Sequence, residues 1–194
     1  MASVTIPNKV SNIGDWMFGG CWRLATVTIP TGVTNIGHDA FRDCAYLTNL
    51  TMPNSVTNIA EAAFAGCYGL TGVYFKGNTP SVGQYVFDGY GYNHAIIYYL
   101  PGTTGWGATF GGRPTALWQP QVQTNDASFG VRTNEFGFTI AWTSGMVFVV
   151  EACTNLTNPH WSPLRTNTLT SDTFYFRDPA WTNYPARFYR LRSP

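Results

Sequence analysis

The sequence predicts a mainly β fold in two parts: a short solenoid of about four 23-residue coils with a cap, then a small antiparallel β-sandwich. Two observations support this prediction. One sequence pattern recurs every 23 residues from residue 4 to about residue 95, and a fixed interval of this size is typical of stacked repeats. The composition then changes near residue 119, beyond which short alternating strands are separated by turn residues.

The repeats align when four segments, which begin at Val4, Val27, Leu50 and Val73, are written beneath one another. Apolar residues recur at equivalent positions, so each coil is expected to bury them against the next coil, and one coil alone would not fold. The recurring positions hold Ile13, Ile36, Ile59 and Val82; Phe18, Phe41, Phe64 and Phe87; Cys21, Cys44 and Cys67; and Leu24, Leu47 and Leu70.

Each coil contains one predicted strand. The spacing Leu24-x-x-Val27-x-Ile29 fits the strand signature of leucine-rich repeats. Because side chains alternate along a strand, Val27 and Ile29 are expected in the core, while Thr26 and Thr28 face solvent.

The repeat also carries a family resemblance. The run V-T-I-P-x-x-V-T-N-I-G-x-x-A-F-x-x-C-x-x-L, here from Val27, resembles the BspA-like leucine-rich repeats of bacterial surface proteins over residues 4 to about 95. The fourth copy departs from this run, since Lys76, Tyr90 and Asn93 replace its Pro, Cys and Leu. The resemblance implies an extracellular or cell-surface location and attachment to host or matrix proteins.

Residues 98–118 resemble the closing segment that follows such arrays, and we expect Trp106, Phe110 and Trp118 to cover the open end of the solenoid. The first domain is therefore predicted to span residues 1–118.

Residues 119–194 are predicted to form the second domain, a fibronectin-III-like β-sandwich. The run VVEACTNLTNPHWSPL, residues 149–164, and the terminal YPARFYRLRSP, residues 184–194, also resemble a C-terminal module of secreted bacterial proteins. The predicted strands are Phe136 to Trp142, Met146 to Ala152, Trp161 to Arg165, Thr173 to Arg177 and Arg187 to Arg192.

Charge and composition narrow the classes of partner. Eleven Lys and Arg against ten Asp and Glu give a net charge of +1, so no basic footprint for nucleic acid is present. No apolar run approaches the roughly 18 residues of a membrane span, so we expect no membrane insertion. The N-terminus lacks the regions of a signal peptide, and we expect the export signal to lie upstream in a longer protein.

The cysteines are predicted to be structural thiols. Cys21, Cys44 and Cys67 share one position of the repeat, so their side chains should stack in parallel as small buried groups. Parallel Cβ vectors suit a disulfide poorly, and Cys153 has no identifiable partner.

A second recurring position gives the best catalytic candidates. It holds Asp15, His38 and Glu61, and in-register stacking would place an imidazole between two carboxylates, a set able to shift a pKa or hold a metal. The position precedes the buried Phe by three residues and varies as solvated loop positions do. We therefore expect no metal, no cofactor and no enzymatic activity, and we keep hydrolysis as a third hypothesis.

The remaining surface features favour binding. One row on the sheet face is expected to become aromatic toward the cap, and exposed loop rings are suited to stacking on sugars or anchoring a protein. The row is predicted to hold Thr5, Thr28, Thr51, Tyr74 and Tyr99, and the loop rings are Trp16, Trp22, Tyr46, Tyr68, Tyr85 and Tyr92.

Two principal hypotheses follow for function. The first is a non-catalytic extracellular recognition or adhesion module that binds a protein or matrix ligand. The second is a carbohydrate-binding protein whose exposed aromatic side chains bind a polysaccharide, and a flat row of coplanar rings would favour it.

Overall fold

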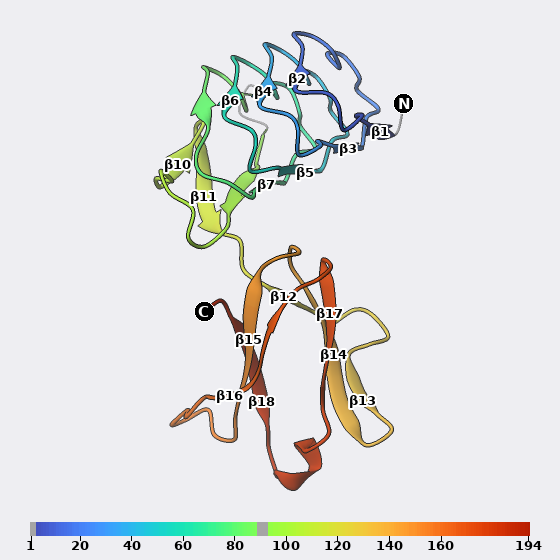
Figure 1. Cartoon of the computed structure of the whole chain (residues 1–194), viewed down its shortest axis with the longest axis vertical. Coiled ribbons are helices and arrows are strands. Elements are labelled where there is room, and N and C mark those ends of the chain that lie inside the picture. Colours follow the sequence, from blue (N-terminus) through green and yellow to red (C-terminus); the bar gives the residue numbers. More distant parts are fainter. Residues whose placement is uncertain (1–2, 89–92) are drawn as a thin grey trace. The chain divides into compact units, whose positions relative to one another are not determined.

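The computed structural model describes residues 3–88 and 93–194. The chain divides into two compact units, residues 1–118 and residues 119–194 (Figure 1). In these described ranges, regular structure is almost entirely β, with one short 3-10 helix at Trp181–Asn183. Within the described residues, no helix has the length and apolar character needed to cross a membrane.

The first unit is a β-solenoid in which each coil contributes strands to two walls. In the first wall β1 pairs with β3, and β5, β7, β9 and β11 pair side by side, all in parallel, while β10 is antiparallel to β11. In the second wall β2, β4, β6 and β8 pair in parallel. The bounds are β1 Ser3–Thr5, β2 Asn12–Ile13, β3 Thr26–Thr28, β4 Asn35–Ile36, β5 Asn49–Met52, β6 Asn58–Ile59, β7 Gly72–Phe75, β8 Ser81–Val82, β9 Ile96–Tyr99, β10 Thr109–Phe110 and β11 Arg113–Leu117.

A third wall is formed by turns that hydrogen-bond from coil to coil. The backbone N–H of Phe41 donates to the carbonyl oxygen of Ala63 at 2.8 Å, and that of Phe64 donates to Val86 at 2.9 Å. One position has positive φ in four of these turns, and a second position has positive φ in the first three. They are occupied by Trp16, Asp39, Ala62 and Tyr85, and by Gly20, Asp43 and Gly66.

The core of the solenoid is a column of phenylalanine rings. Phe18 stacks on Phe41 at 5.1 Å between centroids, Phe41 on Phe64 at 5.2 Å, and Phe64 on Phe87 at 5.7 Å. The interplanar angles are 18°, 5° and 12°. This in-register column confirms the predicted stacking of equal coils.

The cap closes the end of this core with two of the three predicted rings. Trp106 and Phe110 pack on Phe75, with centroids 4.9 Å and 5.4 Å away. Trp118 does not join them, because its ring packs against Tyr74, at 5.0 Å. The side chain of Tyr74 lies on the opposite side of the strand from the buried Phe75.

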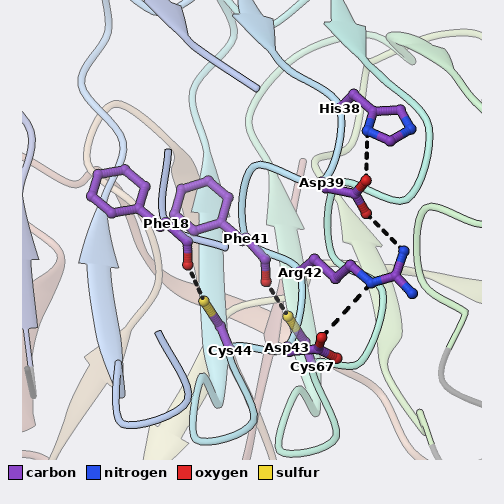
Figure 2. A network of polar contacts seen from close by, with 8 residues as sticks. All are labelled: Phe18, His38, Asp39, Phe41, Arg42, Asp43, Cys44 and Cys67. Carbon is purple, nitrogen blue, oxygen red and sulfur yellow. Dashed lines mark hydrogen bonds and ion pairs between the residues drawn. The ribbon is translucent and has the colours of Figure 1, made fainter. Parts of the chain in front are cut away.

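The cysteine side chains donate hydrogen bonds within the solenoid. The Cys44 thiol donates to the carbonyl oxygen of Phe18 at 3.3 Å, and the Cys67 thiol donates to that of Phe41 at 3.1 Å (Figure 2). The hydrogen bond with Cys44, together with burial, raises the pKa of the Cys67 thiol. All four cysteines are free thiols.

The second unit contains two antiparallel sheets. In one sheet β14 pairs with β17 on one side and with β12 and β13 on the other, and the second sheet has the order β16, β15, β18. The predicted strands correspond to β14 to β18, while β12 and β13 were not predicted, and the fibronectin-III-like topology stays a prediction. The bounds are β12 Gln121–Gln123, β13 Gly130–Arg132, β14 Glu135–Ala141, β15 Val147–Cys153, β16 Ser162–Thr168, β17 Thr173–Asp178 and β18 Phe188–Arg192.

Candidate recognition surface of the solenoid

The outer face of the first wall presents a polar row that becomes aromatic. The strand register places Thr5 beside Thr28 and Thr51 beside Tyr74. The three threonines are exposed, because alternate residues of the same strands fill the core. The positions of Thr28, Thr51 and Tyr74 on the outer face therefore agree with the predicted row.

The prediction that Tyr99 continues this row was wrong. The register places Tyr98 beside Tyr74, and Tyr99 beside the buried Phe75. The strand pairing advances by 24 residues here instead of 23, and a shift of one residue exchanges the two faces of a strand. Tyr99 therefore stacks on the cap residue Trp106, at 5.2 Å and 7°.

At the cap end of the row, three aromatic rings pack on one another. Tyr74 stacks on Tyr98 at 4.8 Å and 8°, and Trp118 packs against Tyr74 with an interplanar angle of 56°. Burial, followed by the neighbouring Tyr98 hydroxyl, raises the pKa of Tyr74. Much of each stacked ring face is therefore occupied by its neighbour.

A separate line of rings, the turn ridge, consists of Trp22, Tyr46 and Tyr68. These residues occupy the same turn in three consecutive coils, and their exposed fractions are 52%, 61% and 45%. Trp22 and Tyr46 are 6.1 Å apart with an interplanar angle of 59°, and the Arg23 guanidinium lies 4.5 Å from the Trp22 ring. The turn ridge precedes the sheet strands by only a few residues, so it borders the polar row.

The turns of the third wall hold the predicted catalytic candidates, but with different partners from those expected. The Asp15 carboxylate accepts the backbone N–H of His38 at 2.8 Å and does not contact the imidazole. The His38 Nδ1 atom lies 2.5 Å from the carboxylate of Asp39, which is 1% exposed, and Arg42 Nη1 lies 3.0 Å from the same carboxylate (Figure 2). The prediction that the His38 imidazole lies between the carboxylates of its column was wrong for Asp15, because that carboxylate is used to hold two coils together.

Glu61 and His38 do share a hollow in this wall. It has a volume of about 290 Å³ and a mixed polar and apolar lining that includes Arg42 and Asp88, whereas Asp15 is not part of it. Within the described ranges, no group of three or more His, Cys, Asp or Glu side chains has the geometry to hold a metal ion. The arrangement offers charged contacts to a ligand.

Two further exposed rings stand apart from the turn ridge. Trp16 is 56% exposed and Tyr85 is 61% exposed, and both have a φ of 57°. An L-residue in this left-handed region costs about 1 kcal/mol, and exposed rings recover little of it by burial. The predicted loop residue Tyr92, like Tyr90 in the degenerate repeat, lies outside the described residues.

Sequence reasoning missed Tyr98 and Trp118 as neighbours of Tyr74 at the cap end of the row. Trp118 follows the last strand of the cap, and it was expected to cover the open end of the solenoid. Asp39 follows His38 directly, its φ is 54°, and its buried carboxylate contacts that imidazole. The departure of the fourth repeat from the pattern was the available signal that the strand register changes before Tyr98.

Comparison with known proteins agrees with the architecture. The family model described as BspA type leucine rich repeat region matches residues 1–98 in six copies. No curated protein and no solved structure matches the chain. The match covers half of the chain and falls on the coils that carry the phenylalanine column, and so the chain belongs to the BspA-type leucine-rich-repeat family.

Proposed function

We propose that this chain is a non-catalytic recognition module that binds a protein ligand at the outer surface of its solenoid. Repeat domains of this family serve in protein interactions and are typical of bacterial surface or secreted proteins. The proposed binding surface combines the turn ridge with the polar row beside it, and an extracellular or cell-surface location follows from the proposal.

The turn ridge is the observation that carries the proposal. Trp22, Tyr46 and Tyr68 are each about half exposed, at 52%, 61% and 45%. Exposed Trp and Tyr at one turn of three successive coils add nothing to the core. Such residues are the commonest energetic anchors of protein interfaces, because they supply a large apolar area together with a polar atom.

The geometry favours a protein over a polysaccharide. A flat sugar chain stacks best on coplanar rings with open faces, but Trp22 and Tyr46 are inclined by 59°. Tyr74 and Tyr98 are nearly parallel at 8°, but they stack on each other. Inclined rings instead suit separate pockets of a folded partner.

The polar neighbours of the ridge support the same proposal. The exposed row of Thr5, Thr28 and Thr51 offers hydroxyl groups beside the aromatic anchors. An interface of this kind has an apolar centre and a polar surround that is able to hydrogen-bond. Attachment to a matrix protein, which the family resemblance implies, is the specific form of the proposal.

The test is binding of the full chain to immobilised matrix proteins and to insoluble cellulose and chitin. We expect retention on a protein surface, and we expect the triple variant Trp22→Ala, Tyr46→Ala, Tyr68→Ala to bind at least tenfold more weakly. Tyr85→Ala is the matched control, because Tyr85 is as exposed as Tyr46 but lies in the third wall.

Retention on cellulose or chitin alone would support the carbohydrate-binding alternative and contradict the proposal. Equal protein binding by the triple variant and the unmodified chain would show that the ridge is not the binding surface.

A further inference from the structure

The two sheets of the sandwich face each other over only part of their width. β18 faces β14, because Phe136 stacks on Tyr189 at 5.0 Å and 12°. β15 faces β17, because Phe148 and Phe174 are 5.4 Å apart. β12 and β13 lie on the side of β14 away from β17. Among the described residues, no strand of the second sheet therefore lies across from β12 and β13.

β18 forms the border of this open region. It pairs with β15 along Phe188–Arg192, and within the described ranges it pairs with no other strand. Alternate residues of an edge strand direct unpaired N–H and C=O groups outward, where an added strand is able to pair with them. The open edge is thus a template for one more strand.

A cavity lies inside this open edge. Its volume is about 210 Å³, and its lining is mostly aromatic and aliphatic. Of its lining residues, Phe129 is 45% exposed. The lining residues are Val122, Phe129, Phe136, Phe138, Tyr189 and Arg190.

We propose that β18 and this cavity form a binding slot for an extended segment of a partner protein. The segment pairs with β18 as an added strand. One of its apolar side chains enters the cavity, and acidic side chains lie on the opposite face beside Arg190 and Arg192. This slot is independent of the solenoid surface proposed above.

Charge identifies the occupant. Arg190 Nε lies 2.7 Å from the Glu151 carboxylate and Arg192 Nε lies 2.9 Å from it, so two guanidinium groups share one carboxylate. Acidic residues on the added strand would balance the remaining positive charge. A second copy of β18 would bring arginines from two strands together, which disfavours self-pairing.

The test uses the full chain and a seven-residue amidated peptide in which Glu alternates with Val and the central residue is Phe. Amide NMR spectra and hydrogen exchange are recorded during titration. We expect shifts at β18, Val122 and Phe129, and at least tenfold slower exchange of outward-facing β18 amides. The same peptide with Lys for Glu should bind at least tenfold more weakly.

Val122→Trp fills the cavity and should weaken binding of the Glu peptide at least tenfold. Leu156→Trp, at an exposed loop position, is the matched control and should bind as the unmodified chain does. If Val122→Trp does not fold, the protection of β18 amides in the unmodified chain decides the question.

Three results would overturn the proposal: no shifts at millimolar peptide, shifts confined to the solenoid, or equal binding by the folded Val122→Trp variant. A dimer formed through β18 without peptide, detected by sedimentation, would assign the edge to a second copy and would also overturn it.

Discussion

The solenoid and the sandwich both bury aromatic side chains, but they bring them together in different ways. In the solenoid, Phe41 and Phe64 hold the same position of successive coils and stack at 5.2 Å. In the sandwich, Phe136 and Tyr189 come from strands in different sheets, and nothing in a local repeat relates them. A solenoid contact therefore recurs from coil to coil, whereas each sandwich contact is made once.

This difference predicts how far the effect of removing one buried side chain extends in each unit. Each solenoid coil contacts only its neighbours, so loss of one central ring weakens two interfaces at once. In the sandwich, longer strands such as β14 and β15 each pair with two or more others, and the ionic contacts of Glu151 link neighbouring strands.

The largest effect is expected for Phe41→Ala. Phe41 is fully buried and stacks on Phe18 and on Phe64, so the substitution should lower the free energy of unfolding of the solenoid by about 3–5 kcal/mol. Phe18→Ala, at the partly buried end of the column, should cost less. Urea unfolding followed by circular dichroism measures both, and an equal loss would contradict the column.

A smaller, pH-dependent effect is expected in the sandwich. Hydrogen bonds from Arg192 and Arg190 lower the pKa of Glu151 in the folded state. The ionised carboxylate therefore stabilises the fold above its unfolded pKa of about 4.3, and this contribution is lost as the pH falls through the lower folded value.

Urea unfolding at pH 7 and at acidic pH tests this expectation. Glu151→Gln should flatten the acid dependence of the sandwich, whereas Glu61→Gln, at an exposed position of the solenoid, should leave it unchanged. An unaltered acid dependence in Glu151→Gln would remove the ion-pair explanation.

The smallest effect is expected at a strained turn of the solenoid. Tyr85 has a φ of 57° and is 61% exposed. Tyr85→Gly should relieve about 1–2 kcal/mol of strain, which exceeds the entropic cost of glycine of about 0.4–1 kcal/mol, so it should raise the free energy of unfolding. Tyr46 is equally exposed but is not among the residues with positive φ. Tyr46→Gly should therefore lower it by about 0.4–1 kcal/mol. Thermal unfolding compares the two, and a gain in both would contradict the strain argument.

The same contrast explains what the sequence was able to predict. The column of Phe18, Phe41 and Phe64 was predictable because residues 23 positions apart occupy equivalent places in stacked coils, so their side chains point in the same direction. The prediction of the sheet-face row was wrong where the 23-residue interval changed. One additional residue turned Tyr99 toward the cap and placed Tyr98 beside Tyr74.

The sandwich was less predictable because its pairings are not periodic. β14 and β15 were visible as long alternating runs, but β12 and β13 each span three residues and contain a single apolar side chain. The contact of His38 with Asp39 was also hidden, because the equivalent position in the other coils holds Trp16, Ala62 and Tyr85, so the carboxylate does not recur.

The coupling energy between Phe41 and Phe64 tests the central claim, direct stacking of coils in register, more directly than any single substitution. Urea unfolding of Phe41→Leu, Phe64→Leu and the double variant gives this energy. The stacked rings predict a coupling of about 0.5–1.5 kcal/mol beyond the loss of apolar burial. Strictly additive effects of the two substitutions would contradict the stacked column and the surface that it supports.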